Sequence, residues 1–305
     1  MNVLNNYMSI KHIVISGGGP TMLGSLGTIH HLINENFLNI DNIESIYGTS
    51  AGILVAVLLC LKFDIETIYD YIIKRPWHTI FPISVQDIFD AYTKKGIFDI
   101  KTLEKCFKPL FDAKDLAMDI TLEDFYNYSK IELHAFTFEI NDFKLEDISY
   151  LTHPKLPLMQ AILMTCSLPI LVTPVCVDGK CYTDGGIVCN YPLKYCIESG
   201  KNEDEILGIK NVFDINNKNI IDTESTLLDF IIHFLFKAVY NLSIDHTQPR
   251  IKYEIACDTI SLTINDFKIS LSSIEKRIEL YKRGVDFAIT FLSIFSNSSN
   301  LKNSV

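Results

Sequence analysis

A serine inside a glycine-rich pentapeptide is the strongest candidate for a catalytic group in this sequence. Residues 48–52 read GTSAG and fit G-x-S-x-G, a pattern in which the serine occupies a strained turn between a strand and a helix. The small residues Gly48, Ala51 and Gly52 let the backbone pack tightly at such a turn, which exposes the Ser50 hydroxyl. The turn also brings Ser50 to a helix N-terminus, where unpaired amides favour negative charge. The pattern predicts a nucleophile, and an ordinary helix N-cap is the alternative.

Three consecutive glycines, Gly17, Gly18 and Gly19, lie between a β-branched stretch and a helical pattern. A glycine loop in this context can bind phosphate, but a dinucleotide fingerprint requires glycine where Met22 stands, and a P-loop requires lysine where Ser25 stands. Both nucleotide-binding interpretations therefore fail. Because three glycines leave a patch of backbone amides without side chains, the loop predicts N–H donors for an oxyanion.

A nucleophilic serine needs a base, and the sequence offers two kinds. A Ser-His-Asp mechanism of the α/β-hydrolase type would use His233, which has apolar neighbours, or His246, in a polar stretch; both resemble ordinary core or surface residues. Residues 183–186 read TDGG, and an aspartate beside two glycines can approach another segment closely. Partial burial near Ser50 would raise the pKa of Asp184 from its usual ~3.9. Asp184 is the favoured base, with the histidine mechanism and a plain Asp-Gly turn as alternatives.

The elements that would position these groups alternate between strands and helices. Residues 12–16 and 43–47 are short β-branched stretches, and each passes through a tight turn into a helical pattern, over 23–36 and from 53 onwards. This alternation predicts an α/β fold with a mainly parallel central sheet flanked by helices, and ligands beyond the carboxyl ends of its strands. The serine and the glycine loop should therefore lie at one edge of the sheet.

The middle of the chain is less regular. Residues 64–130 look helical and are expected to form a cap or lid over the sheet. Strands are expected at 131–140, in a hairpin around Val175 and Tyr182, and at 205–209 as the last strand of the sheet.

The C-terminal third predicts two helices, over 225–243 and 271–295, around a strand-like segment. A frayed tail is expected at 296–305. Without an internal repeat or a long linker, residues 1–305 are expected to form a single domain, with a motif-bearing core at about 10–210 and a helical extension at about 220–295.

Composition limits the function classes. The chain has 305 residues, 48% of them hydrophobic and 21% charged, as is typical of globular proteins. Its net charge of −10 offers no basic surface for nucleic acid, so nucleic-acid binding is excluded. The eight cysteines form no C-x-x-C pair, and a chain of this size needs no disulfides to fold, so free thiols are expected.

The N-terminal region lacks the features of a secretory signal, and the longest apolar run, residues 53–61, is far shorter than the ~20 residues that span a bilayer. An intracellular, cytoplasmic protein is therefore expected, with only peripheral contact to membranes. Residues 227–240 are the candidate for such contact, because their apolar side chains nearly encircle a helix; a buried core helix is the alternative. With a net charge of −10, membrane binding should depend more on buried apolar area than on anionic lipid.

The three motifs together resemble the patatin-like phospholipase family. The glycine run, the GTSAG pentapeptide and Asp184-Gly185-Gly186 occur in the order and spacing of that family. The stretch from Ser167 to Pro192, which includes the Asp178-Gly179 turn, also looks like the family segment that carries the catalytic aspartate. The resemblance covers residues 10–210.

The resemblance implies a three-layer patatin-like fold and a serine-aspartate dyad without histidine, with Ser50 as nucleophile and Asp184 as general base. It implies an oxyanion hole formed by the amides of Gly17, Gly18, Gly19 and Ala51. The implied substrate is a membrane lipid or another acyl ester, and no metal or other cofactor is implied. The head group and the oligomeric state stay open.

One departure from the family concerns the end of the glycine loop. Family members usually continue with a basic residue and another glycine, where this chain has Thr21 and Met22, and Pro20 has no N–H to donate. The departure predicts a working but slow enzyme, in which Thr21→Arg changes activity by less than about tenfold. The alternative from another class is a catalytically weak or inactive protein that keeps the fold and binds lipid or a partner.

Overall fold

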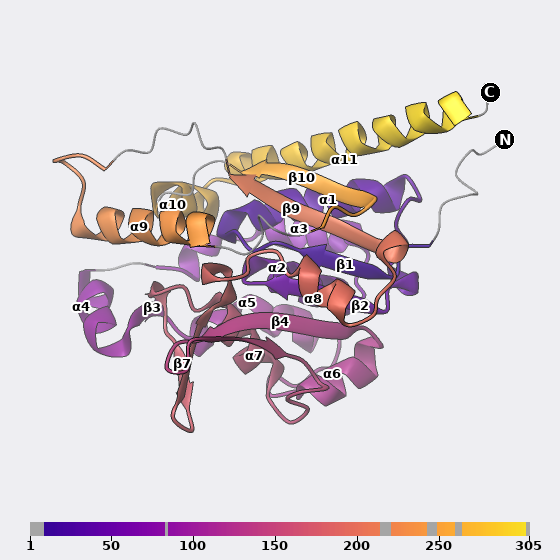
Figure 1. The fold of residues 1–305 in the computed structure, drawn as a ribbon. Helices are drawn as coiled ribbons and strands as arrows, with labels where there is room; N and C mark the ends of the chain where they lie inside the picture. The colour runs from indigo at the N-terminus through magenta and orange to yellow at the C-terminus, as the bar shows by residue number, and fades with distance from the viewer. Residues whose placement is uncertain (1–8, 83–84, 214–220, 243–248, 260–263, 303–305) are drawn as a thin grey trace.

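The computed structural model describes residues 9–82, 85–213, 221–242, 249–259 and 264–302. Within these ranges an eight-stranded sheet runs through the molecule in the order β10-β9-β1-β2-β4-β8-β7, with β5 also paired to β4 (Figure 1). The strands from β10 to β4 are parallel, and β5, β7 and β8 add antiparallel pairs. The bounds are β1 (His12–Ile15), β2 (Ser45–Thr49), β4 (Glu132–Glu139), β5 (Lys144–Ile148), β7 (Val175–Val177), β8 (Lys180–Asp184), β9 (Ile206–Phe213) and β10 (Tyr253–Thr259). The expected α/β fold with a mainly parallel sheet is confirmed.

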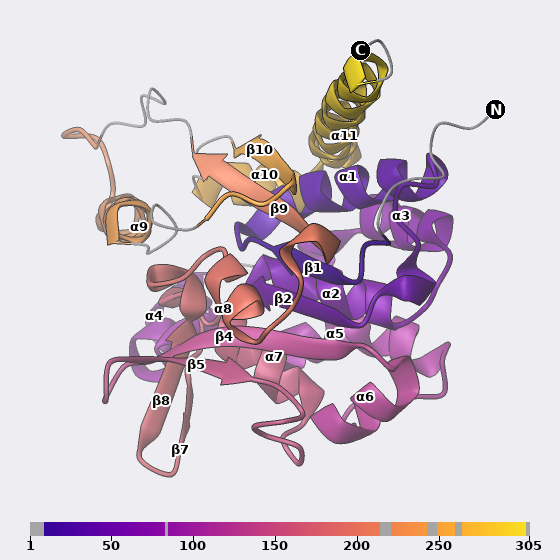
Figure 2. The ribbon, with the colours of Figure 1, turned by 45° about the vertical axis from the view of Figure 1, so that its right-hand side comes forward.

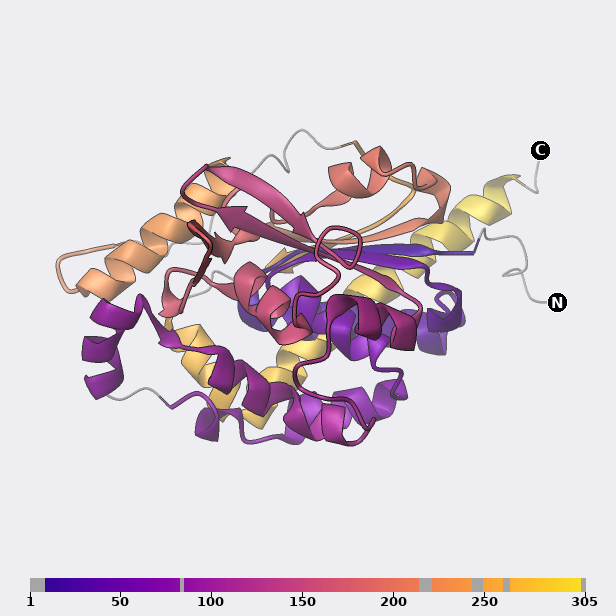
Figure 3. The same cartoon turned by 90° about the horizontal axis from the view of Figure 1, so that it is seen from below.

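Helices cover both faces of this sheet and make a three-layer arrangement (Figure 3). The larger helical layer contains α1 (Met22–Asn34), α2 (Ala51–Cys60), α3 (Ile65–Lys74), α5 (Ile100–Asp112), α6 (Leu122–Ser129), α7 (Leu158–Cys166) and α11 (Ile274–Lys302). On the opposite face, α8 (Leu193–Glu198) packs over a second, smaller apolar cluster that includes Val14 and Tyr47. The remaining helices, α4 (Val85–Lys94), α9 (Leu227–Leu242) and α10 (Ile264–Ser272), lie towards one end of the sheet (Figure 1).

Helix α2 is apolar on all sides, and all of its residues except Leu54 are buried. The C-terminal helix α11 packs closely along α1, because glycines line their contact. A Cβ added at Gly27 would lie 2.1 Å from the Tyr281 carbonyl oxygen, and one at Gly284 would lie 1.9 Å from the Gly24 carbonyl oxygen. These glycines therefore fix the C-terminal extension onto the motif-bearing core.

The structure differs from the expectations in three places. Strand β10 joins the sheet beside β9, so the segment at 205–209 is not its last strand. Helix α11 continues through Lys302, so the tail expected from 296 is helical as far as the description extends. Cys176 and Cys181 face each other across β7 and β8 and form a disulfide, which corrects the expectation that all eight thiols are free. Cys60, Cys106, Cys166, Cys189, Cys196 and Cys257 are free.

A short parallel pair, β3 (Gly96–Phe98) with β6 (Ile170–Val172), lies outside the main sheet. In the described part of the chain, no helix is long and apolar enough to cross a membrane.

Candidate active site

Ser50 occupies a strained backbone turn between β2 and α2. Its φ of 52° and ψ of −125° lie in a region that residues with a side chain rarely adopt. The turn requires glycine on both sides, since a Cβ at Gly52 would lie 2.4 Å from the Ile15 carbonyl oxygen and one at Gly48 would meet Gly52 at 3.1 Å. Gly52 is thus explained by close packing against β1, and Gly48 by close packing against the start of α2.

A threonine that the motif search did not single out supports this turn. The Ser50 N–H donates to Thr165 Oγ1 at 2.9 Å, and the Thr165 hydroxyl donates to the Phe136 carbonyl. Thr165 is fully buried on α7, and Phe136 belongs to β4. The backbone of the turn is therefore bonded to α7 and, through Thr165, to β4.

Asp184 ends β8, beside the same turn. Strand β8 pairs with β4 so that Thr137 faces Asp184, and the Asp184 N–H donates to the Ser167 carbonyl at 3.1 Å. The carboxylate accepts a hydrogen bond of 2.8 Å from the Gly186 N–H, which caps the 3₁₀ turn Gly185–Ile187. Gly185 is required here, because a Cβ would lie 2.3 Å from the Phe136 carbonyl oxygen.

The surroundings of Asp184 change its acidity. The side chain is buried, and burial raises its pKa from 3.8 to about 6, because water no longer stabilises the carboxylate. The Ser50 hydroxyl and the Gly186 N–H act in the opposite direction and lower the pKa. A carboxylate with a pKa of about 6 that interacts with a serine hydroxyl has the properties of a general base near neutral pH.

The glycine loop lies next to these two residues. Gly18 and Gly19 line the same cavity as Ser50, Ala51 and Asp184. The Gly17 N–H, by contrast, donates to the Asn190 carbonyl at 3.1 Å. Gly17 is therefore removed from the candidate amide donors, which leaves Gly18, Gly19 and Ala51.

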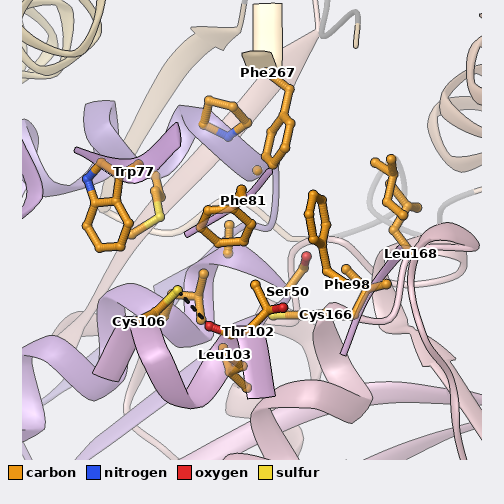
Figure 4. Close-up of a pocket in the computed structure, with 18 of the residues that line it drawn as sticks. Ser50, Trp77, Phe81, Phe98, Thr102, Leu103, Cys106, Cys166, Leu168 and Phe267 are labelled. Carbon is orange, nitrogen blue, oxygen red and sulfur yellow. Dashed lines mark hydrogen bonds between the residues drawn. The ribbon is translucent and has the colours of Figure 1, made fainter. Parts of the chain in front are cut away.

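The cavity at this site has a volume of about 310 Å³ and is almost entirely apolar. Helices α3 and α5 and the segments around them contribute Trp77, Phe81, Phe98 and Leu103, and Phe267 adds a ring from α10 (Figure 4). Ser50 and Asp184 are part of the cavity wall. Such a space suits a hydrocarbon chain whose reactive end lies at the serine.

Cys166 is a further neighbour of the serine that the sequence did not reveal. It lines the cavity beside Ser50, and its thiol interacts with the serine hydroxyl (Figure 4). Burial and the negative charge of Asp184 raise the pKa of this thiol well above its ordinary value. Cys166 is therefore a protonated, apolar part of the wall and not a thiolate nucleophile.

The structure tests one of the two histidines that the sequence offers as alternative bases. His233 lies half-buried on α9 and does not line the cavity, and His246 falls outside the described residues. None of the described histidines lines it. Within the described ranges, no group of three or more His, Cys, Asp or Glu side chains is arranged to hold a metal ion.

The fold and these motifs agree with comparisons to known proteins. A family model for patatin-like phospholipase matches residues 13–197, which is more than half of the chain. The chain belongs to the patatin-like phospholipase family. The crystal structure of VipD from Legionella pneumophila is similar with a TM-score of 0.53 and 18% identity, covering 94% of this chain and 67% of VipD. This likeness shows a shared fold.

Three relatives are similar in sequence. An uncharacterized protein of Acanthamoeba polyphaga mimivirus is 26% identical over 186 residues, which span 60% of each chain. "Probable lipid hydrolase 463L" of Invertebrate iridescent virus 6 is 22% identical over 217 residues, 69% of this chain and 73% of the viral protein. Triacylglycerol lipase ptl3 of Schizosaccharomyces pombe is 25% identical over 171 residues, 52% of this chain and 33% of the lipase. The matched regions thus cover less than two thirds of the mimivirus and yeast proteins.

Proposed function

We propose that this chain is a lipid acyl hydrolase that forms an acyl-enzyme on Ser50, with Asp184 as general base. The observation that carries the proposal is the strained Ser50 turn beside a buried carboxylate with a pKa of about 6, at the wall of an apolar cavity. Family membership and relatives named as a lipid hydrolase and a triacylglycerol lipase support an acyl ester as substrate.

In this mechanism the Asp184 carboxylate takes the proton of the Ser50 hydroxyl while Ser50 Oγ attacks the ester carbonyl carbon. Collapse of the tetrahedral intermediate breaks the bond to the alcohol, and Asp184 returns the proton to the departing oxygen. A water molecule then gives its proton to Asp184 and attacks the acyl-serine. The fatty acid leaves and Ser50 regains its proton.

The developing oxyanion requires hydrogen-bond donors at the site of attack. Gly18 and Gly19 line the cavity together with Ser50, and Ala51 is the first residue of α2, where the first amides have no partner within the helix. The positive end of the α2 dipole adds to this stabilisation. We propose these three amides as the oxyanion hole.

We further propose that the protein docks on lipid with the end of the molecule that carries the site. Helix α9 packs beside the turn that follows Asp184, and it exposes Leu227, Phe230 and Phe234. Helix α4, which exposes Phe89 and Tyr92, lies at the same end of the sheet (Figures 1 and 3). Large apolar side chains at this end would enter the lipid interface and bring the cavity close to its substrate.

Hydrolysis of defined lipids tests the proposal. Phospholipids, lysophospholipids and triacylglycerols in mixed micelles are compared for fatty-acid release by the wild type, Ser50→Ala and the control Ser25→Ala. Ser25 is buried on α1, its hydroxyl has no hydrogen-bond partner among the described residues, and it does not line the cavity. We expect release from at least one class, a loss of more than ~1,000-fold in Ser50→Ala, and full activity in Ser25→Ala.

The same experiment separates the alternatives. Binding of these lipids without any release of fatty acid, by a protein whose fold is intact, would favour the non-catalytic lipid-binding protein. Retained activity in Ser50→Ala would contradict the serine mechanism in either its aspartate or its histidine form.

A further inference from the structure

The glycine loop is held in place by hydrogen bonds to its carbonyl groups. The Gly17 carbonyl accepts two side-chain amides, from Asn211 Nδ2 at 2.7 Å and from Asn190 Nδ2 at 3.1 Å. The Gly18 carbonyl accepts the Thr21 hydroxyl at 3.0 Å and the Thr21 N–H at 3.1 Å. Two successive peptide groups of the loop are therefore fixed on their oxygen side.

Fixing a carbonyl also aims the amide that follows it. A trans peptide group is planar, so its C=O and N–H point in opposite directions. The bonds to the Gly17 carbonyl thus orient the Gly18 N–H, and the bonds to the Gly18 carbonyl orient the Gly19 N–H. Among the described residues, none accepts a hydrogen bond from either amide, and both glycines line the cavity with Ser50.

Thr21 and Asn211 form one interlocked unit. Asn211 Nδ2 donates its second hydrogen to Thr21 Oγ1 at 2.9 Å, and the Asn211 backbone N–H donates to Ser16 Oγ at 3.1 Å. Asn211 lies on β9, the strand next to β1, and both side chains are buried. The pair packs directly on Gly18, where a Cβ would lie 2.3 Å from Thr21 Oγ1 and 2.7 Å from Asn211 Nδ2.

Within the described structure, the arrangement leaves the other polar atom of the Asn211 amide, its oxygen, without a hydrogen bond. Asn211 Oδ1 is buried and has no hydrogen-bond partner among the described residues. Leaving a buried acceptor unpaired is unfavourable. The orientation is kept because both Nδ2 hydrogens are used, one on the Gly17 carbonyl and one on Thr21.

We infer that Thr21 and Asn211 are positioning residues that aim the Gly18 and Gly19 amides at the oxyanion; this inference rests on the proposed function. Thr21 stands where related proteins usually carry a basic residue, and here a short hydroxyl side chain orders the loop from within. The inference therefore predicts a larger effect for Thr21→Arg than the change of less than about tenfold expected from the sequence. The Thr21 side chain is buried and hydrogen-bonded, so an arginine would displace the loop.

Steady-state kinetics on a soluble short-chain ester test the inference. Thr21→Val keeps the shape and removes the hydroxyl that bonds the Gly18 carbonyl and accepts from Asn211. We expect kcat to fall about 10- to 100-fold, below the ~10²–10³ typical for complete loss of one oxyanion donor, with KM within about twofold. Thr21→Ser keeps the hydroxyl and should stay within about threefold of the wild-type kcat.

A matched control comes from α1, the helix that begins directly after Thr21. Thr28 is fully buried on α1, and its hydroxyl donates to the Gly284 carbonyl at 2.9 Å, at the contact with α11. Thr28→Val therefore removes the same kind of bond away from the loop, and we expect it to leave kcat unchanged.

A trifluoromethyl ketone, which forms a hemiketal oxyanion with a reactive serine, gives a second measurement. Its affinity for Thr21→Val should fall by the same factor as kcat/KM.

A second variant keeps the test informative if Thr21→Val does not fold. Asn211→Asp is nearly isosteric but places an oxygen against the Gly17 carbonyl, and it should also lower kcat with little change in KM. Folded variants that turn over at the wild-type rate would overturn the inference, as would an equal loss of kcat in Thr28→Val. Activity that survives Ser50→Ala would instead overturn the proposed function itself, so the two failures are distinguishable.

Discussion

Burial of the Asp184 carboxyl has opposite effects on catalysis and on stability. Catalysis needs a carboxylate that is basic enough to take a proton, and burial supplies this by raising the pKa from 3.8 to about 6. The same burial makes the charged form costly for the folded state. Because both effects arise from the same buried carboxylate, replacing Asp184 by a neutral side chain should lower activity and raise stability.

The pH dependence of kcat/KM follows from this pKa. As the proposed base, Asp184 can accept a proton only when it is deprotonated, so kcat/KM should rise with pH, with a midpoint near 6, and then level off. Asp184→Asn should lose several orders of magnitude of activity and this midpoint with it. Initial rates on a non-ionisable ester between pH 4.5 and 9 provide the measurement. A wild-type profile that is flat through this range would contradict the assignment of Asp184 as the base.

The stability of the fold should fall with pH where kcat/KM rises. The folded state binds the Asp184 proton more tightly than the unfolded state, so the free energy of unfolding falls as pH rises from about 4 to about 6. Above that window the full penalty applies, and a pKa moved from 3.8 to about 6 corresponds to about 3 kcal/mol. Asp184→Asn removes the charge while its side-chain oxygen can still accept the Gly186 N–H. Urea unfolding at pH 7.5 should therefore show that Asp184→Asn is more stable than the wild type. Equal or lower stability of the variant would argue against a costly buried charge at Asp184.

Local sequence patterns predicted the strand, turn and helix around the glycine loop and around the GTSAG pentapeptide, because tight turns require small residues wherever they occur. Ser50 and Asp184 could be identified in this way, as could the hairpin at the Asp178-Gly179 turn. The supports of the site could not. Thr165 lies 115 residues from Ser50, and Asn211 lies 194 residues from Gly17, so only the folded sheet brings them together. The Cys176–Cys181 disulfide depends in the same way on the register of two strands.

A buried arginine at the wall of the cavity joins three helices. Arg277 on α11 uses all five of its N–H groups on backbone carbonyls, two towards Ile73, one towards Arg75, and one each towards Ser270 and Leu271. These carbonyls belong to the C-terminal ends of α3 and α10, where a cation also complements the helix dipoles. Arg277 therefore holds together the walls that supply Trp77 and Phe267 to the cavity.

Arg277→Lys tests this role. Lysine keeps the charge but has three donors in place of five, and it leaves buried carbonyls unpaired. We expect the free energy of unfolding in urea to fall by about 2–4 kcal/mol. Arg283→Lys is the matched control, since Arg283 lies on the same helix with an exposed bond to the Asp258 carbonyl, and it should change stability by less than about 0.5 kcal/mol. Equal unfolding midpoints for the two variants would show that Arg277 does not join the helices.

At the scale of the whole molecule, the candidate site lies at the end of the sheet where α4 and α9 expose large apolar side chains. The carboxyl ends of the parallel strands and helices α4 and α9 lie at this end (Figure 2). The cavity lies there too, because Gly18 and Ser50, which line it, follow the carboxyl ends of β1 and β2. One apolar core extends from Ile10 to Phe291, which supports the proposal that the chain is a single domain. We therefore expect the whole protein to approach a lipid surface in one orientation, with the cavity facing the lipid.

Vesicle flotation tests this orientation. Replacing Phe230 and Phe234 together by serine removes apolar area from α9, and we expect the bound fraction on phosphatidylcholine vesicles to fall at least about threefold. The paired control Ile289→Ser and Ile294→Ser alters exposed side chains on α11, away from the site, and should bind like the wild type. Because the net charge is −10, added anionic lipid should not strengthen binding. Binding that strictly requires anionic lipid would contradict the docking proposal.

The central claim is that Ser50 is the nucleophile of this protein, and active-site labelling tests it most directly. The folded protein is treated with a fluorophosphonate, which phosphonylates activated serines, and the adduct is located by peptide mass spectrometry. We predict one adduct per chain, on Ser50, with none in Ser50→Ala and much slower labelling in Asp184→Asn, whose base is missing. An adduct on another serine, or undiminished labelling of Ser50→Ala, would contradict the account.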